Sequence, residues 1–472
     1  MKIKITILVI MFFLNIGFAN FINDNLITLP DHFKVENTFT GDLADNESFH
    51  LIFAKNRKTK SFEVFSYLYD GEKIIELGVL KNQHSSSLVS FHFKDEMLSL
   101  LMSYKIKKKD FIKRIDLNIE SKEIKETKSF THKDFETSFR QDNRSILIYK
   151  NKTVILIKQF IGFDELKEKT IAINIEGSPI KSYFKDQYIS AINTDEFVVN
   201  GSTSKLKVYL VDDDLIFTKE DQKGNQTSVL RFSLKNEAEP YHKCFNGINT
   251  EKFKKSTSYV FDKKLYQLAI SKDRGLIVVW DIYTNKVLSK IPLQESLGNN
   301  IKSNSTFKGI TNFLKQASRK KYIPTLSVNK TVSNNSLVRI DYVDITYSYN
   351  YNWWWHHHQF MMWQQQQMHF QNSMNNIPSF GPSLNDTYIS DIFDLSTIDR
   401  YFELLIDEGG SISNDDDIKT VYKNIDKEDY IEKLEDIDDF RYESSCFLKD
   451  SFRFIAYSKV REGFVVQTNT LK

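Results

Sequence analysis

The chain has 472 residues, of which 64 are lysine or arginine and 62 are aspartate or glutamate, so its formal net charge is +2. A protein that binds nucleic acid through the phosphates needs a basic excess to displace their counterions. This balance therefore argues against a nucleic-acid-binding protein.

The N-terminus has the pattern of a secretory signal. Lys2 and Lys4 precede an apolar run from Ile5 to Phe13, and small or polar residues then lead to Ala19. A charged start, a short apolar core and a small-residue end predict that residues 1–19 are cleaved and that the protein is secreted or periplasmic. An uncleaved membrane anchor is the alternative. No later segment is apolar over a spanning length, so we expect no integral membrane span after the signal is removed.

Residues 20–293 repeat one local theme, in which short β-rich runs alternate with polar turns. The clearest early case extends from Ser48 to Leu80, where turns at 56–60 and at Asp70-Gly71 separate runs rich in Phe, Val, Ile and Tyr. Because no helical period separates these runs, the pattern predicts a mainly β fold with antiparallel strands.

The most regular unit extends from Leu265 to Leu293 and reads LYQLAISKDRGLIVVWDIYTNKVLSKIPL. Its run LIVVWD ends at Trp280-Asp281, and YTNK supplies the next turn. This unit resembles a blade of a WD40-type β-propeller, although Asn285 stands where that family usually has glycine. The resemblance implies a divergent β-propeller of about six to eight blades. A pair of two-sheet sandwiches is the alternative, to which the low count of 16 glycines lends some weight.

Residues 294–443 are atypical, and we interpret them as a partly helical, low-complexity insertion in the β scaffold. Helical spacing of apolar residues predicts helices near 307–314 and within 418–434, and Ser396 is placed to cap a third helix that extends to Ile406. The closing segment, 444–472, alternates like a β-strand and is expected to complete the ring with the N-terminal strands.

A stretch of repeated residues, NYNWWWHHHQFMMWQQQQMHFQN, occupies positions 350–372. Imidazoles and thioethers are ligands that copper prefers, so the stretch offers four candidate copper ligands: His356, His358, Met362 and His369. Tandem slippage within a tolerated loop is the competing interpretation, which we favour because long loops accept insertions at little thermodynamic cost.

The tryptophans of the same stretch are harder to explain by slippage. Rings of this size hide a large apolar area when they pack, so we expect some of them to contact the protein or a partner. The candidate partner surface consists of Trp353, Trp354, Trp355 and Trp363.

Two other features suggest local chemistry. Cys244 and Cys446 are the only cysteines, and in an exported chain we expect them to form one disulfide. The carboxylate triplet Asp212 to Asp214 could hold calcium, but it lacks the spaced ligands and the glycine of an EF-hand loop. We therefore predict a solvated turn there.

The sequence contains no G-x-S-x-G, H-E-x-x-H, P-loop or G-x-G-x-x-G motif, so whether the protein is an enzyme stays open. We predict a binding or interaction module, with no cofactor, for an unidentified protein, peptide or carbohydrate. One alternative is a propeller-based hydrolase or lyase whose polar residues converge only in the folded channel. The other alternative is a copper-binding protein.

Overall fold

The computed structural model describes residues 26–43, 47–141, 144–161, 165–172, 179–184, 189–194, 197–198, 201–221, 225–236, 239–248, 253–293, 301–303, 309–344, 401–413, 418–425 and 427–471. The chain divides into two compact units. We call Met1–Ser85 with Lys427–Lys472 the terminal unit, and Ser86–Asp426 the central unit.

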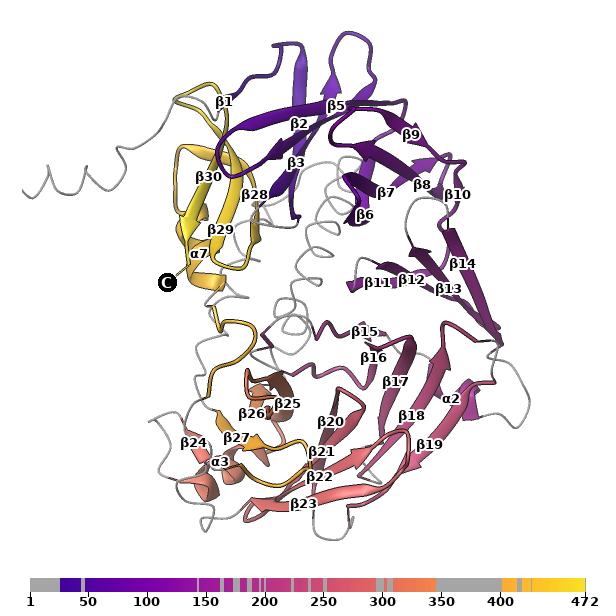
Figure 1. The fold of residues 1–472 in the computed structure, drawn as a ribbon, viewed down its shortest axis with the longest axis vertical. Helices are drawn as coiled ribbons and strands as arrows, with labels where there is room; N and C mark the ends of the chain where they lie inside the picture. The colour runs from indigo at the N-terminus through magenta and orange to yellow at the C-terminus, as the bar shows by residue number, and fades with distance from the viewer. Residues whose placement is uncertain are drawn as a thin grey trace, which may run out of the picture. The chain divides into compact units, whose positions relative to one another are not determined.

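The terminal unit contains two antiparallel four-stranded sheets (Figure 1). One is a meander of β2 (Phe33–Asp42), β3 (Ser48–Asn56), β4 (Phe62–Tyr69) and β5 (Ile74–Asn82). The other, which follows helix α7 (Lys427–Glu435), has the order β1 (Leu26–Ile27), β30 (Gly463–Thr470), β29 (Ser451–Ser458) and β28 (Phe440–Phe447). Because β1 pairs with β30, the prediction that the closing segment joins an N-terminal strand is confirmed.

The central unit contains five sheets in chain order. The first has β6 (Ser86–Lys94), β7 (Met97–Ile106) and β8 (Lys109–Asn118), with β9 (Ile124–Glu126) and β10 (Phe130–Thr131) both on β8. The second has β11 (Phe135–Gln141), β12 (Arg144–Lys150), β13 (Val154–Ile161) and β14 (Glu165–Ala172). Helix α2 (Pro179–Phe184) follows it.

The third sheet has β15 (Ser190–Ala191), β16 (Leu206–Val211), β17 (Asp214–Asp221), β18 (Gln226–Ser233) and β19 (Tyr241–Phe245). The fourth has β20 (Lys255–Phe261), β21 (Lys264–Ile270), β22 (Gly275–Asp281) and β23 (Val287–Leu293). The fifth follows the order β24 (Ile301–Ser303), β27 (Phe402–Ile406), β26 (Ser336–Asp344) and β25 (Tyr322–Lys330), and helix α3 (Ile310–Ala317) precedes β25.

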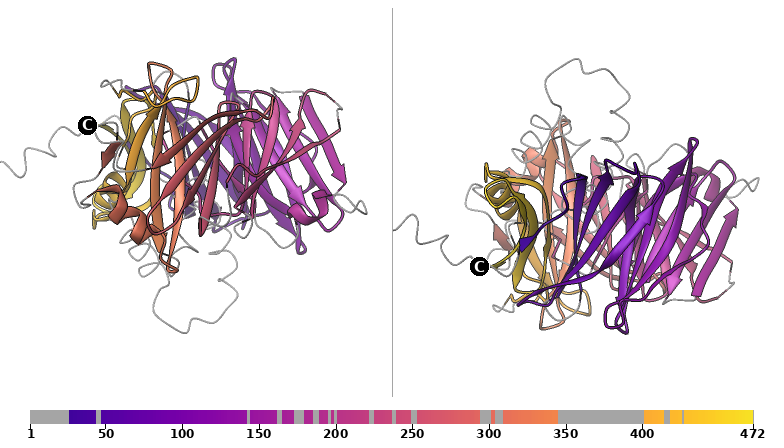
Figure 2. Two further views of the ribbon diagram at one scale, coloured as in Figure 1. Left: turned by 90° about the horizontal axis from the view of Figure 1, so that it is seen from below. Right: turned by 90° about the horizontal axis from the view of Figure 1, so that it is seen from above.

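The seven sheets of the described residues are small and twisted (Figure 2), and their strands pair antiparallel except for the short parallel pair β15–β16. Such four-stranded antiparallel sheets are the blades of propeller folds. The prediction of a mainly β protein built from propeller-type blades is confirmed, and seven sheets lie within the predicted number of blades.

Successive sheets of the central unit pack face to face. One apolar cluster joins Val89 and Leu101 of the first sheet to Leu147 of the second, and a larger cluster joins Tyr259 of the fourth sheet to Leu326 of the fifth. Because both faces of an inner strand are covered, the strands read as nearly continuous apolar runs without strict alternation.

The blade predicted at Leu265–Leu293 forms three strands of the fourth sheet. The Trp280 indole N–H donates a hydrogen bond of 2.6 Å to Gln267 Oε1, and the ring packs edge-on against Phe245. Asn285 has a φ of 60°, so it adopts the left-handed conformation that glycine takes most easily. This explains how asparagine replaces the usual glycine at that position.

Tight hairpins form here without glycine. The turn pairs Lys107-Lys108 and Asp262-Lys263 have positive φ at both residues, as a two-residue hairpin of type I′ requires. These left-handed residues are charged and each turn links two consecutive paired strands. The low glycine count therefore does not favour the sandwich alternative.

Two of the helix predictions within 294–443 are confirmed in part, and one is wrong. Helix α3 covers the predicted 307–314 from Ile310 onward, and α7 lies in the second predicted range. The helix predicted from Ser396 to Ile406 is wrong over its described part, because residues 402–406 form β27 and pair with β26. The run contains Leu404, Leu405 and Ile406, whose side chains a strand buries as readily as a helix does. No helix among the described residues has the length and apolar character needed to cross a membrane.

Candidate functional site

One edge of each described sheet carries small, buried hydroxyl side chains. The edge strands concerned are β2, β6, β11, β15, β20, β25 and β28. Their buried hydroxyls include Thr38, Thr40, Ser86, Ser87, Ser90, Thr137, Ser138, Ser190, Ser256, Thr257, Ser258, Thr325, Ser327, Ser444 and Ser445. A hydroxyl beside a base is the arrangement of an activated nucleophile, so the partners of these groups decide whether they can be catalytic.

In the terminal unit, His50 lies between two of these hydroxyl groups. Its Nε2 is 3.0 Å from Ser48 Oγ and its Nδ1 is 3.0 Å from Thr40 Oγ1. Thr40 in turn contacts Ser444 Oγ at 3.0 Å. Burial and the nearby positive charge of Arg453 lower the pKa of His50 to about 3, so the imidazole is neutral at ordinary pH.

The distance between Ser48 and His50 is that of a nucleophile and its base, but the pair is not accessible to solvent. Both side chains are 0% exposed, so no substrate reaches them. The group on the far side of the ring is a hydroxyl, whereas catalytic triads place an acid or amide there. These hydrogen bonds can fix the orientation of the neutral imidazole, which is a structural role.

Arg453 extends this network across the two sheets of the terminal unit. Its guanidinium donates hydrogen bonds to Thr468 Oγ1 at 2.9 Å and to Ser48 Oγ at 3.1 Å, and it lies 4.5 Å from the centre of the Tyr69 ring. The side chain is 0% exposed. A buried cation held by hydroxyls and an aromatic face links the sheet of β29 to the sheet of β3 and β4.

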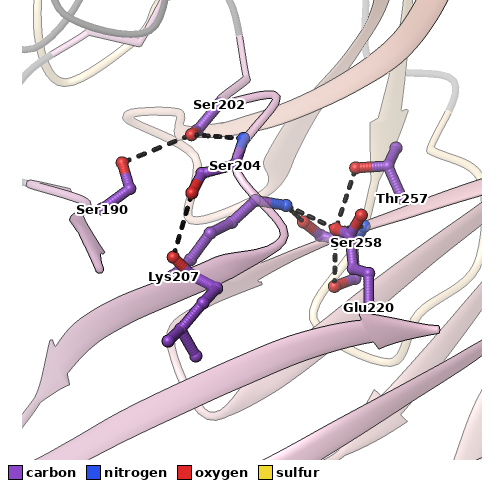
Figure 3. A network of polar contacts seen from close by, with 8 residues as sticks. Ser190, Ser202, Ser204, Lys207, Glu220, Thr257 and Ser258 are labelled. Atoms are coloured by element: carbon purple, nitrogen blue, oxygen red, sulfur yellow. Dashed lines mark hydrogen bonds and ion pairs between the residues drawn. The ribbon is translucent and has the colours of Figure 1, made fainter. Parts of the chain in front are cut away.

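In the central unit, Lys207 and Glu220 form a second buried network (Figure 3). Lys207 Nζ donates to Glu220 and, at 2.8 Å, to the carbonyl of Ser258. Glu220 Oε1 also accepts from the Ser258 backbone N–H at 2.8 Å and from the Thr257 hydroxyl at 3.1 Å. Lys207 lies on β16 and Glu220 on β17, and both bond to β20 of the next sheet. The pair therefore joins the third and fourth sheets.

Serine hydroxyls adjoin this pair in Figure 3 but bond to one another and to the backbone. Ser190 Oγ is 3.3 Å from Ser202 Oγ, and Ser204 Oγ donates to the carbonyl of Leu206 at 3.2 Å. Ser190 and Ser202 are buried. These groups have the residue types of catalysis, yet they serve to hold the third sheet together.

Of the carboxylate triplet, Asp212 and Asp213 lie in the predicted turn between β16 and β17, Asp214 begins β17, and cations neutralise the group. Asp213 contacts Arg144 and Lys235, both at 2.7 Å, and Asp212 contacts Lys263 at 3.1 Å. These ion pairs lower the pKa of Asp213. The described part of the chain contains no group of three or more histidine, cysteine, aspartate or glutamate side chains that could hold a metal ion.

The residues proposed from the repeated stretch lie outside the described residues, so copper binding and the tryptophan surface stay predictions. They are His356, His358, Met362, His369, Trp353, Trp354, Trp355 and Trp363. Cys244 is half-buried on β19 of the central unit, where its thiol donates to Gln226 Oε1 at 3.0 Å. Cys446 is buried on β28 of the terminal unit, and its predicted pairing with Cys244 also stays a prediction.

Charged groups line a surface hollow of the terminal unit. Its volume is about 700 Å³, and its lining comprises Pro30, Asp31, His32, Arg57 and Lys58. The Arg57 backbone N–H donates to the carbonyl of His32 at 2.8 Å, which continues the β2–β3 ladder outward. Two residues further along the same ladder, Lys34 lies opposite Lys55. We call His32, Lys34, Lys55, Arg57 and Lys58 the basic hollow.

The cations of the basic hollow are not neutralised by direct ion pairs within the part of the chain that the structure describes. Lys34, Lys55, Arg57 and Lys58 form no ion pair with any described residue. Some buried cations elsewhere, such as Arg114, form ion pairs with carboxylates. The hollow therefore offers positive charge to a ligand.

Sequence reasoning missed the basic hollow. The segment KNRKTK, residues 55–60, was interpreted only as a turn, and HFK at 32–34 drew no attention. The signal was present as two short basic segments in neighbouring strands. Only the register of β2 on β3 brings them together.

No protein-family model matches the chain, and no curated protein matches it. Among solved structures, the chain is similar to a mutant of NanB sialidase from Streptococcus pneumoniae, with 8% identity, 70% of this chain and 69% of that chain covered, and a TM-score of 0.25. It is similar to Hsv2 from Kluyvelomyces marxianus, with 8% identity, coverages of 90% and 94%, and a TM-score of 0.28. It is also similar to the WD40 domain of SCAP from fission yeast, with 8% identity, coverages of 67% and 88%, and a TM-score of 0.25. TM-scores this low support no inference about function, and the fold assignment rests on the sheets themselves.

Proposed function

We propose that this protein is a binding module that recognises a protein or peptide partner through its surface. One contrast supports the proposal. Two pairs with the residue types of acid–base or nucleophilic chemistry, Ser48 with His50 and Lys207 with Glu220, are buried and bonded to one another. The basic hollow, by contrast, lies on the surface, and its cations form no ion pair with any described residue.

The physical reason is access. A general base or nucleophile acts only within hydrogen-bond reach of the substrate, and a residue that is 0% exposed has no such reach. A binding surface needs the opposite, namely accessible groups whose interactions are not already satisfied by the protein. Arginine is enriched at the energetic centres of interfaces, and Arg57 is exposed in the hollow.

A selection with a displayed random-peptide library, performed on the immobilised full chain, tests the proposal. We expect enrichment of peptides that bind saturably and reversibly in solution. A panel of sugar, ester and phosphodiester substrates, assayed in parallel, should show no turnover. If no peptide is enriched, or if turnover occurs and disappears in Ser48→Ala or Glu220→Gln, the binding-module proposal is wrong and the hydrolase alternative gains support.

A further inference from the structure

We infer that the basic hollow binds an extended acidic segment of a protein partner, with carboxylates two residues apart. This inference rests on the proposed function and specifies the chemistry of the partner. It follows from the register of two strands, from the absence of ion pairs and from the spacing of the cations.

The β2–β3 ladder arranges four of the side chains as a block. Lys34 lies directly opposite Lys55, and His32 and Arg57 form the next row outward, two residues along, where the Arg57 backbone N–H donates to the His32 carbonyl. The neighbouring Phe33 packs against the apolar core, whereas Lys34 is exposed and points away from it. Directly opposite residues have Cβ atoms about 5 Å apart, and rows two residues apart are separated by about 6.7 Å.

This spacing matches an extended peptide. Side chains at positions i and i+2 of a ligand strand point to one side and repeat at about the same 6.7 Å. One carboxylate can therefore meet Arg57 while the next meets Lys34 and Lys55. The Arg57 guanidinium offers two parallel N–H donors to a carboxylate, and Lys58 in the adjoining turn extends the positive strip.

The arrangement is unfavourable without a ligand. Like charges directly opposite on neighbouring strands destabilise a sheet, and Lys34 opposite Lys55 is such a pair. Lys55 finds partial compensation over the Phe62 ring, where its Nζ lies 5.1 Å from the centroid. The half-buried Glu36 interacts electrostatically with both lysines, but burial disfavours its ionised form and raises the pKa of its carboxyl. An acidic ligand would remove the repulsion.

Three features limit the ligand. Asp31 lies in the same lining beside His32, which disfavours a ligand acid at that end and places the segment along Arg57, Lys55 and Lys34. A single phosphate would contact only one row, because the strip extends over two rows and a turn. The net charge of only +2 for the whole chain also argues against a nucleic-acid ligand, which requires a broad basic surface.

The test uses a fluorescently labelled octaglutamate peptide and the full chain, with fluorescence anisotropy as the readout. We expect saturable binding that weakens as salt is raised. Arg57→Glu and Lys34→Glu should each weaken binding by about tenfold or more, since each removes an attraction and adds a repulsion. The matched control is Lys449→Glu, an exposed lysine in the β28–β29 turn of the same unit, which makes the same change in net charge. It should alter the affinity by less than about twofold.

Lys34→Glu also separates loss of binding from loss of folding. Glutamate opposite Lys55 turns a repulsive cross-strand pair into an attractive one, so this variant should melt at the wild-type temperature or above while binding less well. The inference is overturned if the three variants weaken binding equally, if wild type does not bind octaglutamate, or if inorganic pyrophosphate occupies the site and octaglutamate does not displace it. Where octaglutamate fails but the peptide library yields other ligands, the binding-module proposal survives and only the acidic-partner inference falls.

Discussion

The buried imidazole of His50 makes the stability of the terminal unit depend on pH. Its pKa is about 3 in the folded protein and 6.5 for an ordinary histidine. Between these values the unfolded chain binds a proton that the folded chain excludes. The free energy of unfolding should therefore fall as the pH drops through about 6.5 and stop falling through this group below about 3. The contribution is fully present at neutral and alkaline pH.

The size of the effect follows from the same two values. At pH 5 the unfolded imidazole is about 1.5 pH units below its pKa and the folded one is still neutral, which corresponds to a loss of about 2 kcal/mol relative to pH 8. Urea unfolding followed by far-ultraviolet circular dichroism at pH 8 and pH 5 measures the loss. His50→Asn keeps a polar side chain but cannot titrate, so its stability should lose about 2 kcal/mol less over this range than wild type.

Thr40→Val is the matched control, because it removes a hydrogen bond to His50 and leaves the imidazole in place. It should be less stable than wild type at both pH values but lose about as much between them as wild type does. Equal losses in wild type and His50→Asn would refute the claim that His50 excludes a proton from the folded state.

Three further predictions concern other parts of the chain. Lys207→Met leaves Glu220 as a buried acid without its cation and should lower the free energy of unfolding, measured with urea, by about 3–5 kcal/mol. The double variant Lys207→Met with Glu220→Gln should lower the free energy of unfolding by clearly less. Arg453→Lys should lower it by about 2 kcal/mol or more, because an ammonium cannot reproduce the planar contacts of the guanidinium with Thr468 and the Tyr69 ring; a melting temperature equal to that of wild type would contradict this role. The copper-binding alternative requires that calorimetric titration with copper show at least one site that is lost when residues 353–368 are deleted; equal binding by both forms would rule out the histidine and methionine ligands.

The sequence predicted those parts of the fold in which local pattern and tertiary environment agree. In Leu265–Leu293 the run LIVVWD forms a strand and YTNK forms the turn after it, as predicted, because the turn is polar and the strand is rich in buried apolar residues. Helix α3 is a similar case, since its apolar face, including Phe313 and Leu314, is buried as its spacing indicates. Residues 402–406 show the limit, because a short apolar run fits a helix or a strand and its pairing with β26 decides between them.

The functional groups were harder to predict because they depend on contacts between distant segments. His50 and Arg453 are separated by most of the chain, and nothing near either residue indicates that Ser48 lies between them. The basic hollow likewise exists only through strand pairing, since Lys34 and Lys55 belong to different strands with an intervening turn. Sequence patterns do report residue types, but the burial that separates a sealed serine from an accessible one is a property of the packed sheets.

The most direct test of the account measures the dissociation constant of a peptide selected on the full chain, for wild type, Arg57→Glu and Lys449→Glu side by side. The account predicts a dissociation constant about tenfold or more higher for Arg57→Glu, and within about twofold of wild type for Lys449→Glu. Equal affinity of all three proteins for the peptide would contradict the claim that the basic hollow is the surface through which this protein binds its partner.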